Sequence, residues 1–302
     1  MKTVFALAAI VIASSAGVRA LPQQPEARAA VDDATILNYA LTLEHLENAF
    51  YAGALAKFDE KAFAAAGLPP WARGRFVQVG KHEQQHVEFL SAALGDKATK
   101  PCEYKFPYTD PKSFAALSQV LEGVGVSAYA GAAQFITNKD YLTAAASVLS
   151  TEARHASWVA AAVNRVAGWS GAFDVPLGLN EVYTLAASFI TSCPSSNPAL
   201  PVKAFPALAL QPAAPKPGQR TTLKFDVSGV DKSTKLYAAF YTGLDKKFAE
   251  IQNNQVTVPA GLEGNVYAVV SKSSGPALTD EDVVAGPAIL QFNFDSQGRA
   301  LS

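Results

Sequence analysis

The sequence predicts an α+β protein of two domains, in which a four-helix bundle with a short fifth helix precedes a small β-sandwich. Apolar residues follow helical spacing from about residue 34 to residue 191. After residue 220 the pattern changes to short runs in which apolar and polar residues alternate, which is typical of strands. Between these regions, residues 194–219 contain seven prolines and are expected to form an extended linker with some packed apolar contacts.

The helical region is expected to span residues 32–193. Asp32 or Asp33 can cap the first helix, Asp140 can cap the fourth, and Gly95 suits the end of the second, because glycine adopts the left-handed conformation without strain. Small residues such as Gly123 and Gly131 favour close helix packing along the third helix. The predicted helices are 34–58, 71–94, 111–138, 140–168 and 180–191.

The segment between the second and third helices is long enough to run the whole length of the bundle. Residues 96–110 can extend over about 50 Å, whereas the 24 residues of the second helix span about 36 Å. The third helix can therefore run parallel to the second, with a long connection between them.

The C-terminal region, residues 220–296, is expected to form a β-sandwich of immunoglobulin-like type. Glycine, asparagine, serine and proline turns separate its strands. It contains no histidine or cysteine, so we expect a packing or binding module and not a catalytic one. The predicted strands are 222–227, 236–241, 256–258, 265–270 and 289–294.

Two Glu-x-x-His motifs carry the chemistry of the helical region, at Glu83–His86 and Glu152–His155. Residues three apart lie on one face of a helix, so each pair can offer a metal ion one oxygen and one nitrogen. Taken alone, the two motifs are equally compatible with solvated helix faces.

A second repeat favours the metal interpretation. Leu-Glu is followed by Tyr seven residues after the Glu, first at Glu44 and Tyr51 and again at Glu122 and Tyr129. The order Glu, Glu-x-x-His therefore occurs twice, which is the pattern of a dinuclear carboxylate site inside a four-helix bundle. The predicted metal ligands are Glu44, Glu83, His86, Glu122, Glu152 and His155.

Neighbouring residues leave two alternatives open. Glu47 lies one turn from Glu44, but aligning the two halves places it opposite Gly125, so we favour Glu44 as the ligand. His82 has no counterpart in the second half, and we expect it beside the ligands or on the surface. Tyr51 and Tyr129 are candidate catalytic residues that can donate hydrogen bonds to the carboxylates, or else ordinary core tyrosines.

Four carboxylates balance the charge of two divalent cations, and carboxylates with imidazoles suit iron or manganese, with zinc as a substitute. Three functions remain open on these grounds. The first is an oxidoreductase acting on O2 or peroxide. The second is a secreted cell-wall or surface protein with a structural metal site or none, and the third is a metal scavenger.

The motifs over Leu43–Tyr51, Glu83–His86, Leu121–Tyr129 and Glu152–His155 resemble the ferritin-like superfamily. The phrase Leu-Glu-His-Leu-Glu-Asn-Ala-Phe-Tyr is similar to that of secreted fungal ferritin-like proteins, which are related to plant desiccation-related and stress-induced proteins. The resemblance covers residues 32–193. It implies a di-iron or di-manganese bundle with the six ligands named above, and a role in a stress response.

Several features predict secretion. Lys2 precedes an apolar run over residues 4–13, and Val18-Arg19-Ala20 offers a cleavage site, so residues 1–20 are expected to be a signal peptide. Cys102 and Cys193 are then expected to form a disulfide.

The overall charge bears on whether the protein binds nucleic acid or membranes. The net charge of −1 and the pI near 6.4 give no electrostatic case for binding nucleic acid or an anionic membrane. A β domain on a proline-rich tether would obstruct a storage cage, so we expect a small homo-oligomer or a cell-wall association.

Overall fold

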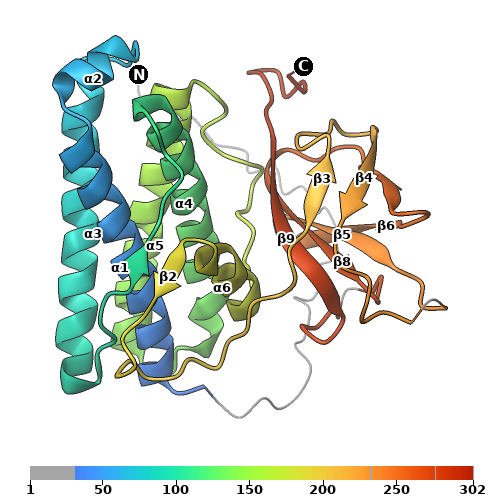
Figure 1. Ribbon diagram of the computed structural model, residues 1–302, viewed down its shortest axis with the longest axis horizontal. Coiled ribbons are helices and arrows are strands. Elements are labelled where there is room, and N and C mark those ends of the chain that lie inside the picture. The colour runs from blue at the N-terminus through green and yellow to red at the C-terminus, as the bar shows by residue number, and fades with distance from the viewer. Residues whose placement is uncertain (1–30, 232, 276, 302) are drawn as a thin grey trace, which may run out of the picture.

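The computed structural model describes residues 31–301 except 232 and 276; the predicted signal peptide lies outside the described residues. Helices form one half of the molecule and strands form the other (Figure 1). This confirms the predicted α+β class with two regions in the predicted order. Within the described residues, no helix is both long enough and apolar enough to cross a bilayer.

Four long helices form the bundle, with α1 packed on α3 and α4 packed on α5 (Figure 1). Their bounds are α1 Asp33–Lys57, α3 Ala72–Leu94, α4 Pro111–Ala132 and α5 Lys139–Trp158. Two short helices, α2 Glu60–Ala65 and α6 Leu179–Ala187, complete the region. Helix α4 is buried without interruption from Leu121 to Ala128, because other elements surround it.

The caps explain where two of these helices begin. Asp32 accepts a hydrogen bond from the Thr35 N–H at 2.8 Å, as predicted for α1. The predicted cap of α5 was wrong: Asn138 accepts from the N–H groups of Asp140 and Tyr141. Asp140 lies instead in the first helical turn, where its negative charge favours the positive end of the helix dipole.

Three helices end earlier in the chain than predicted. Helix α4 gives way to a 3-10 turn, η2 Ala133–Phe135, and α6 ends before a short strand, β2 Ile190–Ser192. Helix α5 passes into a π-helix, η3 Val159–Asn164, which ends at Arg165 in the left-handed conformation with φ 57°. The helical pattern in the sequence cannot distinguish these tighter and wider turns from a continuing helix.

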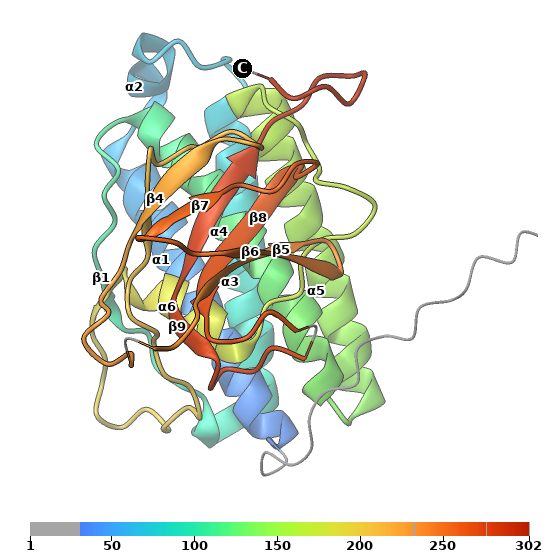
Figure 2. The ribbon, with the colours of Figure 1, turned by 90° about the vertical axis from the view of Figure 1, so that its right-hand side faces the viewer.

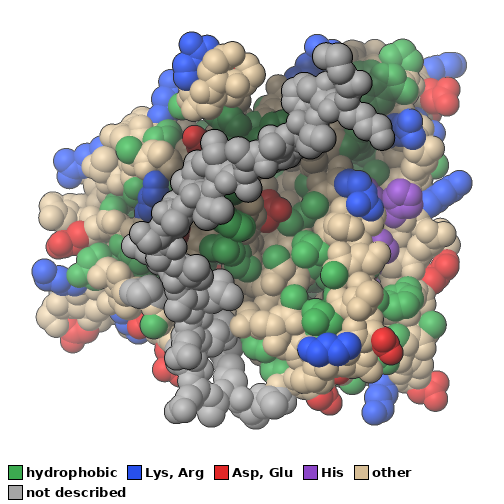
Figure 3. All heavy atoms as spheres, turned by 180° about the vertical axis from the view of Figure 1, so that it is seen from behind, with side chains coloured by type: hydrophobic (Ala, Val, Ile, Leu, Met, Phe, Trp, Pro, Cys, Tyr) green, Lys and Arg blue, Asp and Glu red, His purple; other side chains and the backbone are tan. Residues whose placement is uncertain are grey.

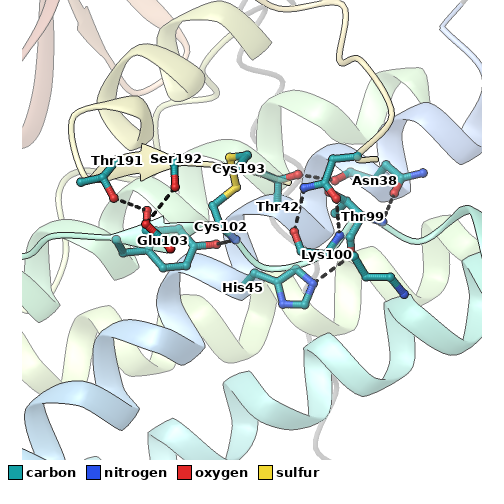
Figure 4. The surroundings of a disulfide bond; sticks show 12 residues. Asn38, Thr42, His45, Thr99, Lys100, Cys102, Glu103, Thr191, Ser192 and Cys193 are labelled. Carbon is teal, nitrogen blue, oxygen red and sulfur yellow. Dashed lines mark hydrogen bonds between the residues drawn. A yellow bond between two sulfur atoms is a disulfide. The ribbon is translucent and has the colours of Figure 1, made fainter. Parts of the chain in front are cut away.

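The connection after α3 begins with a 3-10 turn, η1 Gly95–Lys97, and runs back along the bundle to the start of α4, as predicted (Figure 1). On the way, β1 Glu103–Tyr104 pairs antiparallel with β2. Beside this pair, Cys102 and Cys193 form the predicted disulfide (Figure 4). The bond therefore ties the connection to the segment that follows α6.

Two antiparallel sheets form the C-terminal region. The three-stranded sheet has the order β3-β4-β7, and the four-stranded sheet has the order β6-β5-β8-β9. Leu210 and Leu223 of the first sheet share a core with Phe240 and Val266 of the second, so the sheets form a sandwich. Their bounds are β3 Ala209–Gln211, β4 Arg220–Lys224, β5 Tyr237–Thr242, β6 Asp245–Glu250, β7 Gln255–Thr257, β8 Gly264–Ser271 and β9 Val283–Phe292.

Two of these strands were not predicted. Strand β3 lies inside the expected linker, where Phe205 and Leu210 are buried. Strand β6 forms an edge of its sheet and is rich in charged residues, which weakens the apolar alternation but suits an exposed edge.

The four-stranded sheet packs directly against the bundle (Figure 2). Residues of β8 alternate between two cores: Val266 and Val270 face the other sheet, whereas Tyr267 and Val269 share a core with Val124 of α4. The Tyr267 hydroxyl also donates to the carbonyl of Gly123 at 3.1 Å. The segment after the bundle therefore leads to a β region that packs on the bundle.

The surface carries charges of both signs. On the face seen from behind, basic and acidic side chains are scattered over the coloured part of the molecule (Figure 3). This distribution matches the net charge of −1.

Candidate metal centre

The six predicted ligands meet in the middle of the bundle. Glu44 comes from α1, Glu83 and His86 from α3, Glu122 from α4, and Glu152 and His155 from α5. All four carboxylate residues are at most 1% exposed. Their donor atoms form two groups: Glu44, Glu83, His86 and Glu152 in one, and Glu83, Glu122, Glu152 and His155 in the other.

Within each group the donor atoms lie within 4.8 Å of one another, and Glu83 and Glu152 belong to both groups. His86 Nδ1 lies 3.1 Å from Glu83 Oε2 and 3.3 Å from Glu152 Oε1. His155 Nδ1 lies 3.1 Å from the other oxygen of Glu83, Oε1, and 4.0 Å from Glu152 Oε2. The two shared carboxylates thus lie between the two imidazoles.

The remaining carboxylates each belong to one group. Glu44 Oε2 lies 3.2 Å from His86 Nδ1, and Glu122 Oε2 lies 3.2 Å from His155 Nδ1. The arrangement has an approximate two-fold character, as expected from two similar sequence halves.

The two candidate tyrosines bond across the bundle. Tyr129 of α4 donates to Glu44 Oε1 of α1 at 2.5 Å, and Tyr51 of α1 donates to Glu122 of α4. The Tyr51 hydroxyl also lies 2.7 Å from Ser118 Oγ. Each tyrosine therefore orients a carboxylate of the opposite half, and not the one on its own helix.

Burial and mutual repulsion shape the acidity of the carboxylates. Burial raises the pKa of Glu44 and, together with the charge of Glu83, raises that of Glu152 well above its ordinary value. Burial also acts to raise the pKa of Glu83, but hydrogen bonds from His155 and His86 outweigh it and lower that pKa to about 2.

The imidazoles respond in the opposite sense. Burial by itself would lower the pKa of both, but hydrogen bonds to Glu44 and Glu83 raise that of His86 to about 10. Hydrogen bonds to Glu122 and Glu83 raise the pKa of His155 to about 9. Without metal, two imidazolium charges therefore offset part of the carboxylate charge.

The shared carboxylates have buried oxygens whose hydrogen bonding is incomplete. Both oxygens of Glu152 and Oε1 of Glu83 make no well-aligned hydrogen bond within the described residues, and their nearest cationic neighbours are the imidazoles, with His155 Nδ1 3.1 Å from Glu83 Oε1 and His86 Nδ1 3.3 Å from Glu152 Oε1. An unpartnered buried acceptor costs about 1–3 kcal/mol or more when it is charged, so such atoms call for a cation or a proton. The carboxylate and imidazole donors and their two overlapping groups fit a pair of divalent ions of the iron or manganese kind.

A fifth acid, Glu47, faces the same interior and is 5% exposed. A Cβ added at Gly125 would lie 3.2 Å from Glu47 Oε1 and 3.3 Å from Glu152 Oε2, which places both acids against this glycine. Burial, and then the charge of Glu44, raise the pKa of Glu47 well above its ordinary value. Glu47 belongs to neither group of donor atoms, whereas Glu44 does.

The other histidines occupy two different places. His82 is exposed, and its Nδ1 lies 2.9 Å from His155 Nε2, with the two rings stacked at 5.1 Å. It can therefore fix the orientation of His155, as a partner of a metal-binding imidazole commonly does. His45 lies away from the site, with Nε2 3.1 Å from the Thr99 carbonyl (Figure 4).

Comparison with known proteins agrees with this geometry. Residues 32–165 match the family model described as the ferritin-like domain, and all six candidate ligands lie within that range. The chain is also similar to Protein rds1 of Schizosaccharomyces pombe, with 29% identity over 183 residues, or 58% of this chain and 43% of that protein. The match thus spans less than half the length of that relative. Residues 32–165 are therefore similar to the ferritin-like domain, and a C-terminal β-sheet region follows this helical region.

Proposed function

We propose that this protein is secreted, holds two iron or manganese ions, and acts as an oxidoreductase on O2 or peroxide. The observation that carries the proposal is the pair of overlapping donor groups that share Glu83 and Glu152. Two ions sharing carboxylates at close range can exchange two electrons with one substrate molecule, which reduction of O2 to peroxide or of peroxide to water requires.

The protein residues have distinct tasks in this proposal. Glu44 and His86 would hold one ion, Glu122 and His155 would hold the other, and Glu83 and Glu152 could contribute to both. When bound, the two ions would donate electrons to a substrate or accept electrons from it. The chain positions the ligands, excludes bulk water from the carboxylates, and keeps Glu44 and Glu122 oriented through Tyr129 and Tyr51.

The proposed location and assembly rest on other features. The disulfide suits an oxidising compartment, and residues 1–20 have the pattern of a signal peptide. The sheet that packs on α4 occupies that side of the bundle, so a storage shell of many subunits is disfavoured. We therefore place the activity outside the cell, in a monomer or small oligomer, and assign it to a stress response by the family resemblance.

Metal stoichiometry and turnover together test the proposal. Elemental analysis after reconstitution should find about two iron or manganese ions per chain. Glu152→Ala should lower that number, whereas Glu88→Ala, an exposed acid on α3, should leave it unchanged. The loaded protein should consume peroxide over many cycles, and a zinc-loaded sample should not.

Two outcomes would contradict parts of this assignment. Protein that binds two ions but turns over neither O2 nor peroxide would favour the scavenging or structural alternatives. Glu47→Gln abolishing metal binding, with Glu44→Gln leaving it intact, would show that the wrong acid of α1 has been chosen.

A further inference from the structure

A cleft with both apolar and amide side chains in its walls lies between the bundle and the four-stranded sheet, separate from the candidate metal centre. It consists of two adjoining cavities of about 440 Å³ and 190 Å³, which share Gln119, Asn265 and Gln291 in their walls. None of the six metal-ligand candidates lines either cavity. The larger cavity falls within the size range of small-molecule sites, about 300–1,000 Å³.

The lining is rich in side-chain amides and poor in charge. Gln119 and Asn164 of the bundle face Asn265 and Gln291 of the sheet. Among the described residues, no charged side chain lines the larger cavity, and Asp174 is the single charged residue that lines the smaller one. A ligand that suits this cleft is therefore neutral and forms several hydrogen bonds.

Some of these amides have unused hydrogen-bonding capacity. The side chain of Asn265 makes no hydrogen bond to any other described residue, and its Nδ2 lies against Gly123, 3.0 Å from where a Cβ would be. Gln119 Oε1 accepts a hydrogen bond from Asn164 Nδ2 at 2.8 Å. The NH2 group of Gln119 has no acceptor among the described residues. Asn164 donates to both the Ala115 carbonyl and Gln119 Oε1, so it offers a ligand only its oxygen, whereas Asn265 offers both a donor and an acceptor. Together the amides provide donors and acceptors, which suits hydroxyl groups that also do both.

A large aromatic side chain stands at the smaller cavity. Trp169 is 71% exposed, yet the next residue, Ser170, is buried and accepts a hydrogen bond from the Asn265 N–H at 2.9 Å. Gly264 makes this close approach possible, because any Cβ there would lie 2.3 Å from the Ser170 Cα. The loop is thus anchored beside an indole that remains largely in water.

The backbone that leads into the cleft is irregular. Asn164 is the last residue of the π-helix η3, and Arg165 after it has the left-handed φ of 57°. Single π turns and non-glycine residues with positive φ are uncommon, and both are enriched at functional sites. Here the widened turn ends at Asn164, one of the amides in the cleft wall.

We propose that this cleft binds a neutral oligosaccharide. A sugar ring presents hydroxyls that donate and accept, which match the four amides, and a face of C–H groups that can stack on the Trp169 indole. Phosphate or carboxylate ligands would lack a cationic partner in the lining, and an apolar ligand would leave the amides without partners. Bound polysaccharide would hold the protein at a carbohydrate surface, and this inference does not depend on metal chemistry.

Binding to defined hexasaccharides tests the proposal. The probes are laminarihexaose, cellohexaose, chitohexaose and mannohexaose, with a heparin hexasaccharide as the charged comparison, measured by calorimetry on the full chain. We expect at least one neutral probe to bind with a Kd of about 1 mM or tighter. Trp169→Ala and Gln119→Ala should each weaken that binding about tenfold, which corresponds to about 1.4 kcal/mol.

Matched substitutions outside the cleft serve as controls. Trp71→Ala removes another exposed tryptophan, and Gln78→Ala removes an exposed glutamine of α3; both should bind like the unmodified chain. The side chain of Trp169 lies mostly in solvent, so its removal should leave the melting temperature unchanged. Absence of binding by all four neutral probes would overturn the proposal, as would equal binding by the cleft variants and the controls, or tighter binding of the heparin probe.

Discussion

Metal loading of the helical bundle should release protons, in a number that follows from the candidate metal centre. The pKa values of about 10 for His86 and about 9 for His155 mean that both imidazoles are protonated at pH 7. A metal ion binds only the neutral imidazole, so occupation of both groups must release two protons. Glu152, whose pKa is raised well above its ordinary value, adds to this number to the extent that it is protonated.

The energetic size of the effect can be worked from the same values. At pH 7 the pKa of His86 lies about three units above the pH, and that of His155 about two units above it. At 1.36 kcal/mol per unit, deprotonation costs about 4 kcal/mol for His86 and about 3 kcal/mol for His155. These costs fall as the pH rises. Affinity for the pair of ions should therefore increase about a hundredfold per pH unit from 7 to 9, about tenfold from 9 to 10, and little above 10.

Calorimetric titration with manganese in two buffers of different ionisation enthalpy gives the proton count directly. The His45→Gln variant is a suitable control, because His45 lies outside the site and burial lowers its pKa, so it carries no proton to release at pH 7. Two bound ions with fewer than one proton released per chain would refute the reasoning. Affinity that does not change between pH 7 and 9 would refute it equally.

Three further predictions concern stability and ligand orientation. Replacing Cys102 and Cys193 with serine opens a loop with a sequence separation of 91, which should lower the free energy of unfolding by about 4–5 kcal/mol in urea titrations; an unchanged midpoint would contradict this. Gly131→Ala places a Cβ 1.8 Å from the Leu177 carbonyl oxygen and should lower the free energy of unfolding by more than about 2 kcal/mol. In the control Gly74→Ala on α3, the new Cβ meets nothing within 4 Å and should raise that free energy by about 0.5–1 kcal/mol. Equal melting temperatures for the two variants would contradict the packing argument. Tyr129→Phe removes the hydrogen bond to Glu44 and should weaken the binding of one ion about tenfold in a metal competition assay, with the stability of the fold nearly unchanged. If both ions bind as tightly as before, this hydrogen bond does not orient the ligand.

Much of the helical region could be predicted because its signals are local. The spacing in Glu-x-x-His fixes two donors on one helix face, and its recurrence with Glu44 and Glu122 predicted the group that the bundle brings together. Capping was less certain, since Asn138 and Asp140 are both good caps two residues apart. Strand β3 was missed because its partner β4 is separated from it by a proline-containing segment, and pairing between strands is not a local property.

The small residues of α4 show where a local pattern misleads. They were expected to serve helix–helix contact, but Gly131 lies against the Leu177 backbone and Gly123 against the Asn265 side chain. Only Gly125, of the three, faces acids of the bundle interior. Composition indicates that something packs closely, but it does not say what.

The sequence by itself determined the order of the long helices, the change from helices to strands, the disulfide pair and the residues able to ligate metal, because periodicity and residue chemistry are properties of short segments. Tertiary structure alone decided which donors are shared between the two groups, that each tyrosine bonds the carboxylate of the opposite half, and that Glu44 belongs to a donor group while Glu47 does not. It also decided that the sheet rests on α4, where the cleft forms. These features depend on the rotation and offset of helices that are distant in the chain, which side-chain packing fixes and no local spacing encodes.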